Sequence, residues 1–212
     1  VVSFLSQSGT HGIMFRLVMA SQGIHLSKCA SFGNAIVLDI SDYLEYLIED
    51  PETKVIGLYV EGVKDGARFV RTLKEACRHK PVVVWKGGQT EAGALATKSH
   101  TASLASPEPI WEGIMKQCGA ISTTSLDETV DVVKLLLNSK PTKGRNLGLM
   151  AMTGGQSVSI TDAFCKVGFD VPALSEQSYE ELGSFFNIVG GSYRNPLDMA
   201  GTIQGNTETL KR

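Results

Sequence analysis

Hydrophobic and polar positions follow two alternating patterns along this chain. Short apolar runs are followed by longer stretches in which apolar residues recur at helical spacing, which is typical of parallel strands joined by crossover helices. Residues 54–60 (KVIGLYV) are apolar on both faces, as in a central parallel strand. The pattern predicts an α/β protein with a doubly wound parallel sheet. We expect strands at 1–6, 25–31, 54–60, 80–85 and 120–121, and helices at 12–22, from 41 onward, 65–78, 109–118 and 126–138.

Three local signals refine these boundaries. Gly23 is expected to close the helix that precedes it as a C-cap. Ser41 is expected to start a helix with an incomplete capping box, because Leu44 rather than Glu stands three positions later. Residues 87–107 are rich in glycine, threonine and serine with weak periodicity, so they predict a long loop, and loops of that length are usually functional.

A polar segment with proline and glycine, residues 139–144 (SKPTKG), predicts a linker. After it the strand-to-helix pattern begins again, with a strand expected at 147–152 and a helix at 156–167 that Gly168 caps. We therefore expect a first domain at 1–140 and the start of a second, truncated one at 141–212. The chain also begins inside a strand, which predicts that it is part of a longer polypeptide.

Composition excludes several classes of protein. The chain has 212 residues, 42% of them hydrophobic and 20% charged, with a formal net charge of -2, so neither nucleic acid nor a membrane surface is an expected partner. Its apolar runs are too short to cross a bilayer, and no secretory leader is visible. No cysteine or histidine spacing predicts a metal site. The expectation is a soluble cytoplasmic protein with four buried, reduced thiols at Cys29, Cys77, Cys118 and Cys165.

Two turns between a strand and a helix are candidate anion sites. Residues 6–12 (SQSGTHG) and 153–157 (TGGQS) combine small residues with a helix start, where unpaired N–H groups and the positive dipole end attract phosphate or carboxylate. Neither turn is a G-x-G-x-x-G or P-loop fingerprint. A Ser157, His100 and Asp162 triad is a rival hypothesis, although the chain order does not match that of the α/β-hydrolase fold.

His100 is the candidate nucleophile. Ser99 and Thr101 flank it in the predicted loop after a strand, and open parallel sheets bind their ligands at the carboxyl ends of their strands. A neutral imidazole can attack phosphorus when an acceptor holds its other nitrogen. Glu61, which ends the strand at 54–60, is the candidate acceptor, and a solvated carboxylate at a strand end is the alternative.

These motifs together resemble the NDP-forming acyl-CoA synthetases, the superfamily of succinyl-CoA synthetase and the ADP-forming acetyl-CoA synthetases. The similarity rests on SQSGTHG at 6–12, YVEG at 59–62, SHTASLA at 99–105 and the Gly154-Gly155 turn. It implies a flavodoxin-like CoA-ligase domain followed by a second, partial one. It further implies that His100 is phosphorylated and that Glu61 orients it. Two anion cradles are implied, at Ser8, Gly9 and Thr10 and at Gly154, Gly155 and Gln156. The chain differs from the family pattern at Thr10-His11, Ala102 and Ser106.

The resemblance implies the reaction acyl-CoA + NDP + phosphate ⇌ carboxylic acid + CoA + NTP, through an acyl phosphate and a phosphohistidine. The expected ligands of this chain are phosphate and the acyl phosphate or acyl-CoA, with no tightly bound cofactor. CoA and the Mg-nucleotide are expected on a CoA-binding domain and an ATP-grasp domain that this chain does not contain. It is therefore expected to be the phosphoryl-carrier core of a larger ligase and inactive alone. The alternatives are a non-catalytic docking module and a flavodoxin-type FMN binder.

Overall fold

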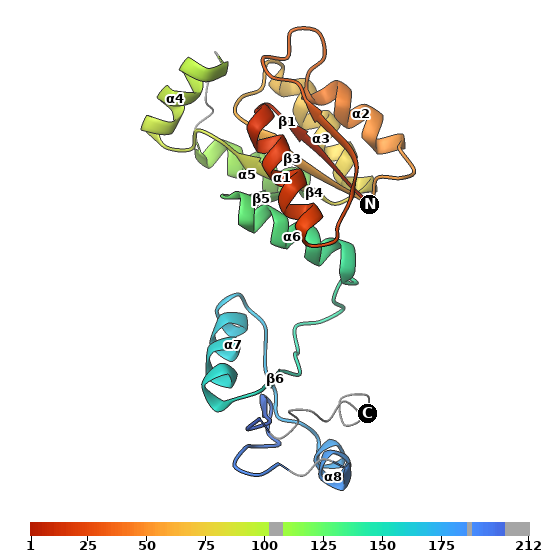
Figure 1. Ribbon diagram of the computed structural model, residues 1–212, viewed down its shortest axis with the longest axis vertical. Helices are drawn as coiled ribbons and strands as arrows, with labels where there is room; N and C mark the ends of the chain where they lie inside the picture. Colours follow the sequence, from red (N-terminus) through yellow and green to blue (C-terminus); the bar gives the residue numbers. More distant parts are fainter. Residues whose placement is uncertain (102–107, 186–187, 202–212) are drawn as a thin grey trace. The chain divides into compact units, whose positions relative to one another are not determined.

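The chain folds into two compact units, Val1–Lys140 and Pro141–Arg212 (Figure 1). The computed structural model describes residues 1–101, 108–185 and 188–201, with the backbone alone for 98–101. The division falls inside the polar segment 139–144, whose residues are exposed.

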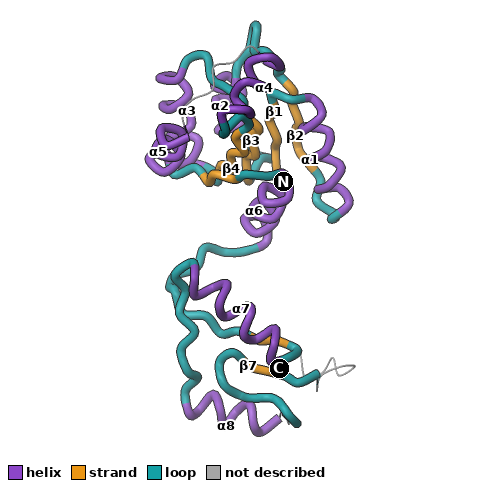
Figure 2. Tube along the Cα trace, turned by 90° about the vertical axis from the view of Figure 1, so that its left-hand side faces the viewer, coloured by secondary structure: helices purple, strands orange, loops and turns teal. Residues whose placement is uncertain are grey.

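The first unit is a five-stranded, fully parallel sheet with helices on both faces (Figure 2). The strand order is β2-β1-β3-β4-β5, the flavodoxin-like order, so the predicted doubly wound α/β fold is confirmed. The strands are β1 (Val2–Ser6), β2 (Leu26–Ser31), β3 (Val55–Val60), β4 (Val82–Lys86) and β5 (Ile121–Thr123). The helices are α1 (Gly9–Ser21), α2 (Ile40–Glu49), α3 (Gly66–His79), α4 (Glu91–Thr101), α5 (Glu108–Cys118) and α6 (Leu126–Asn138).

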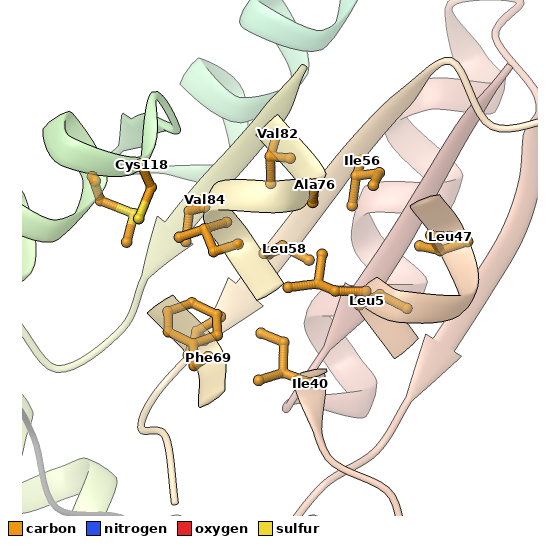
Figure 3. Packing of buried hydrophobic residues seen from close by; sticks show 14 of the residues in the cluster. Leu5, Ile40, Leu47, Ile56, Leu58, Phe69, Ala76, Val82, Val84 and Cys118 are labelled. Carbon is orange, nitrogen blue, oxygen red and sulfur yellow. The ribbon is translucent and has the colours of Figure 1, made fainter. Parts of the chain in front are cut away.

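Successive side chains along each strand point to opposite faces of the sheet, so the sheet separates two hydrophobic cores. In β3, Ile56, Leu58 and Val60 pack with α2, α3 and α5, whereas Val55 and Tyr59 pack on the opposite face with α1 and α6. Successive strand residues point to opposite faces, so a central strand must be apolar on both. Figure 3 shows the first of these cores, with labelled members that include Leu5, Ile40, Leu47, Phe69, Ala76, Val82, Val84 and Cys118.

Glycine is required in the middle of β3. A Cβ on Gly57 would lie 2.7 Å from the Phe4 ring on β1, because Phe4 and Gly57 are paired in the parallel ladder. The Phe4 ring stacks on Phe15 of α1, with ring centroids 3.9 Å apart. The absent side chain thus lets α1 lie close to the sheet at the strand next to the candidate site.

Two predicted local features are wrong. Helix α2 begins at Ile40, next to the expected Ser41, but its N-cap is Asp39 and its capping box is complete, since Asp39 accepts from the backbone of Asp42 while Asp42 accepts from the N–H of Asp39. The predicted loop 87–107 contains helix α4 over Glu91–Thr101. Among the residues of α4 whose side chains are described, only Thr97 is buried, so the helix lacks the apolar stripe that would have revealed it.

The second unit has a small described core. Strands β6 (Met150–Ala151) and β7 (Leu197–Asp198) form a parallel pair, and helices α7 (Gly154–Lys166) and α8 (Glu176–Phe185) accompany them. The predicted helix at 156–167 is confirmed as α7, and Gly168 follows it at φ +90°, a conformation that favours glycine. Among the described residues of this unit, Leu197 and Met199 form the buried hydrophobic cluster, and Ala151 of β6 is also buried.

The cysteine prediction is only partly correct. All four thiols are free, but Cys29 and Cys165 are exposed, Cys77 is half-buried and Cys118 is buried. Burial raises the pKa of the Cys77 thiol to about 12, with a smaller contribution from Cys118. None of the helices in the described part of the chain combines the length and apolar character that a bilayer crossing requires.

Candidate functional site

The candidate site of the first unit lies where the strand order reverses. Chain connections run outward in opposite directions from β1 and β3, which are neighbours in the sheet, and ligands of open α/β sheets bind at the carboxyl ends of strands at such a switch point. The turn at 6–9 follows β1 and Glu61 follows β3. The fold therefore places one predicted anion cradle and the predicted carboxylate on adjacent strand ends.

The turn after β1 is held by its own serine hydroxyls. Ser6 Oγ accepts from Ser8 N at 3.1 Å and donates to Ser8 O at 2.6 Å, and the Ser8 hydroxyl accepts from His11 N at 3.5 Å as the N-cap of α1. Gly9 and Thr10 are exposed in the first helical turn. Ser8 thus shapes the turn, and the backbone of Gly9 and Thr10 forms the exposed helix start that attracts an anion.

Glu61 is buried rather than solvated, with 4% of its surface exposed. The Gln7 side chain fixes its backbone from β1. Gln7 Oε1 accepts from the N–H groups of Glu61 and Gly62, the latter at 3.0 Å, and Gln7 Nε2 donates to Gly62 O at 3.0 Å. This amide joins the two strand ends and accounts for the burial of a glutamine (6% exposed) that the sequence pattern did not single out.

Lys86 holds the same segment from β4. Its Nζ donates to Glu61 O at 2.7 Å and to Gly87 O, and it lies 5.5 Å from the centroid of the Trp111 ring. Burial lowers the pKa of the Lys86 ammonium, and the charge of Glu61 partly offsets that effect. A lysine in this setting is committed to backbone carbonyls, so its described role is to fix the site.

Tyr59 contacts the Glu61 carboxylate directly. Its hydroxyl donates to Glu61 Oε1 at 3.1 Å, because two positions along a strand place both side chains on the same face. The Tyr59 ring packs against His11 of α1 and Trp85 of β4, with centroid distances of 4.4 and 4.6 Å. Burial, followed by the charge of Glu61, raises the pKa of the Tyr59 hydroxyl well above its ordinary value.

His100 lies in the last turn of α4 rather than in a loop. Its side chain, like those of Lys98, Ser99 and Thr101, lies outside the described residues, as does the motif from Ala102 to Ala105 and Ser106 beyond it. The described part of α4 is anchored one turn earlier. Gly88 has φ +71°, and a Cβ there would lie 2.4 Å from Oγ1 of the buried Thr97.

The second predicted cradle starts helix α7. Thr153 is the N-cap and accepts from Gln156 N at 3.4 Å, while Gly154, Gly155 and Gln156 are exposed. A Cβ on Gly154 would lie 3.0 Å from Asp198 Oδ2, so a carboxylate is already close to this helix start. The Asp198 carboxylate complements the helix dipole and would compete with an incoming anion.

Asn195 has a structural role in the second unit. Its Oδ1 accepts from Leu149 N at 2.9 Å, and its Nδ2 donates to Leu147 O and Pro172 O, both at 2.7 Å. The side chain therefore connects three segments by mimicking strand hydrogen bonds. Its polar groups are committed to the backbone.

The rival triad gains no support from the described geometry. Ser157 and Asp162 are five positions apart on α7, which separates them by about 140° around the helix axis. Ser157 Oγ is buried and has no hydrogen-bond partner among the described residues. No group of three or more side chains able to hold a metal ion occurs in the described part of the chain.

The fold and the site define a flavodoxin-like domain with a buried carboxylate and an exposed helix start at its switch point. The family model of the succinyl-CoA ligase like flavodoxin domain matches residues 1–136. The chain belongs to this family, within the NDP-forming acyl-CoA synthetases.

Similar proteins extend the match over both units. The alpha subunit of the ADP-forming acetate–CoA ligase II of Pyrococcus furiosus is 37% identical over 96% of this chain and 44% of that subunit. The ADP-forming acetate–CoA ligase I of Archaeoglobus fulgidus is 38% identical over 94% of this chain and 29% of that protein. The chain spans less than half the length of these curated relatives.

A solved structure shows the same architecture. The dinucleotide-forming acetyl-coenzyme A synthetase 1 of Ca. Korarchaeum cryptofilum, in complex with phosphate and ADP, matches with a TM-score of 0.85 and 33% identity. The match covers 94% of this chain and 43% of that one. The architecture described above is therefore that of a component of such ligases.

Proposed function

We propose that this chain is the phosphoryl-carrier core of an NDP-forming acyl-CoA synthetase, with His100 as the residue that is phosphorylated. The observation that carries the proposal is the buried Glu61, clamped by Gln7, Lys86 and Tyr59 beside the exposed start of α1. A fixed carboxylate that accepts from an imidazole N–H keeps the other ring nitrogen unprotonated and nucleophilic.

The proposed reaction has three steps. Phosphate attacks the thioester carbonyl of acyl-CoA, the C–S bond breaks and CoA is released, which gives the acyl phosphate. His100 attacks the phosphorus, an N–P bond forms, the P–O bond to the acyl oxygen breaks and the carboxylic acid leaves as its carboxylate. A terminal oxygen of the NDP then attacks the same phosphorus, the N–P bond breaks and NTP is released. Transfer of this kind depends mostly on positioning and on stabilising charge.

The two helix starts have defined parts in this proposal. The N–H groups of Gly9 and Thr10 bind the phosphoryl oxygens at a helix start that favours anions. Gly154, Gly155 and Gln156 are the second anion site, where Asp198 must give way or be neutralised. CoA and the Mg-nucleotide bind to a CoA-binding domain and an ATP-grasp domain outside this chain.

The test uses the full-length parent protein with Mg²⁺ and ATP labelled on its γ-phosphate, which runs the last step in reverse. We expect a label that is labile to acid and stable to alkali, as a phosphoramidate is. His100→Asn should abolish it, whereas His79→Asn, which changes an exposed histidine on α3, should not. Glu61→Gln should slow labelling by about 10²-fold or more, as loss of an orienting carboxylate does elsewhere.

The same experiment decides between the carrier and the docking module. A wild-type protein that takes up no label would contradict the carrier function and favour a non-catalytic module. Label that persists in His100→Asn would assign the phosphoryl group to another residue.

A further inference from the structure

We propose that Tyr59 is a positioning residue for phosphoryl transfer, because its hydroxyl fixes the orientation of the Glu61 carboxylate. This inference rests on the function proposed above. The backbone of Glu61 is already held by Gln7 and Lys86, but a glutamate side chain keeps three rotatable bonds beyond its backbone. The hydrogen bond from Tyr59 Oη to Glu61 Oε1, at 3.1 Å, restricts that remaining freedom.

Two aromatic rings hold Tyr59 in place. The rings of His11 and Trp85 lie 4.4 and 4.6 Å from its own, and the His11 and Trp85 rings lie 4.6 Å from each other. These three side chains come from α1, β3 and β4, so the hydroxyl is positioned by elements that are far apart in the sequence. Tyr59 keeps only 7% of its surface exposed in this cluster, so most of the water that would compete for a hydrogen bond with Glu61 is excluded.

Gly87 makes room for the Tyr59 hydroxyl. The strand register pairs Tyr59 with Trp85, which places Gly87 opposite Glu61. A Cβ at Gly87 would lie 2.5 Å from Tyr59 Oη and 3.3 Å from Glu61 Cγ. A side chain at position 87 would therefore displace the hydroxyl that contacts the carboxylate.

The hydrogen bond has a fixed direction. Burial and the Glu61 charge raise the pKa of Tyr59, so the phenol stays protonated and acts as the donor. Glu61 Oε1 is then the acceptor. An oriented carboxylate is what the proposed nucleophilic histidine needs.

Tyr59→Phe in the full-length parent protein tests the inference. The variant keeps the ring and removes only the donor. At saturating Mg-ATP labelled on the γ-phosphate, we expect the single-turnover rate of labelling to fall about 10- to 100-fold, as for a hydrogen bond to a charged group. KM for ATP should not change, since the proposal gives Tyr59 no contact with nucleotide. Tyr43→Phe, in a half-buried tyrosine of α2 whose ring packs on Phe32, is the matched control and should label like wild type.

A double variant separates the hydrogen bond from packing. In Tyr59→Phe/Gly87→Ala the new methyl group enters the space that the lost hydroxyl occupied, although it still lies 3.1 Å from the ring carbon Cζ and 3.3 Å from Glu61 Cγ. We expect the melting temperature to recover toward the wild-type value while labelling stays slow. Recovery of labelling together with stability would overturn the inference, because packing alone would then explain Tyr59.

The remaining outcomes are equally decisive. A wild-type labelling rate in Tyr59→Phe would overturn the positioning role and leave the carrier function standing. An unlabelled wild-type protein would overturn the carrier function, and this inference with it.

Discussion

Single charged residues are used to fix strand ends in this protein. On β2, Lys28 Nζ pairs with Asp50 at 2.8 Å and with Glu52 at 3.1 Å. Asp50 also accepts from the Thr53 hydroxyl, and Thr53 in turn bonds Ser3 of β1 at 2.7 Å. This cluster secures the turn after α2 to the edge of the sheet, as Lys86 secures the segment after β3.

Asp50 makes the stability of the folded chain depend on pH in the acid range. The hydrogen bond from Lys28, followed by that from Thr53, lowers the pKa of Asp50 to about 2 in the folded chain, against about 3.9 for an unfolded aspartate. The stabilisation is therefore complete above about pH 4 and is lost as the pH falls toward 2. In denaturant titrations from pH 6 to 2.5, Asp50→Asn should lower the denaturant concentration at the unfolding midpoint at pH 6. Below pH 4 that midpoint should fall less steeply with pH than in the wild type. Glu49→Gln, at an exposed carboxylate of α2, should leave the profile unchanged.

At the scale of elements, the docking of α4 decides where the histidine lies. The helix is anchored by close approach rather than by an apolar stripe, since Gly93 packs on Gly88 and Thr97 is buried against it. Close contacts of this kind replace hydrophobic burial where a segment has few apolar residues. The helix that contains His100 therefore depends on the turn after β4.

Gly88→Ala should disturb α4 selectively. The φ of +71° costs a residue with a Cβ about 1–2 kcal/mol, and the new methyl group would also meet Thr97 Oγ1. We expect slower His100 labelling with little change in the melting of the sheet, measured by isotope incorporation and circular dichroism. Gly88→Ala/Thr97→Ala removes the clash but not the backbone strain, so it should recover part of the labelling. If Thr97→Ala alone labels like wild type and the double variant labels no faster than Gly88→Ala, the clash with Thr97 is not the cause.

At the scale of the whole molecule, the two units differ in how much core they bury. The first unit has helices on both faces of a five-stranded sheet and two extensive hydrophobic clusters. In the described part of the second unit, the cluster centres on Leu197 and Met199. Stability follows the amount of buried apolar surface, so the units should not unfold together.

Calorimetry of this chain should resolve two transitions, with the second unit melting first. Met199→Ala should lower the first transition alone. Leu73→Ala removes a fully buried side chain from the core of the first unit, which costs that unit about 2–5 kcal/mol of unfolding free energy. It should lower the temperature of the second transition alone. One shared transition that both substitutions lower equally would contradict the independence of the units.

Much of the architecture could be predicted from the sequence, because periodicity directly reports burial. The doubly apolar run at 54–60 predicted a central strand, and β3 is that strand. Helix α4 could not be predicted because its docking uses glycine contacts that leave no periodic signal. The predicted N-cap of α2 was wrong because Asp39, two positions before Ser41, has that role.

The sequence by itself determined the α/β class, the strand-to-helix turns and the residue types available for phosphoryl chemistry, because these depend on local periodicity and on functional groups. Only the tertiary structure decided which groups meet. Gln7 and Lys86 reach Glu61 because β1, β3 and β4 are neighbours in register, a pairing set by long-range packing. Tyr59 is two positions from Glu61 on the same strand, but spacing along a chain carries no information about the contacts from Gln7 and Lys86, and these emerged from the fold alone.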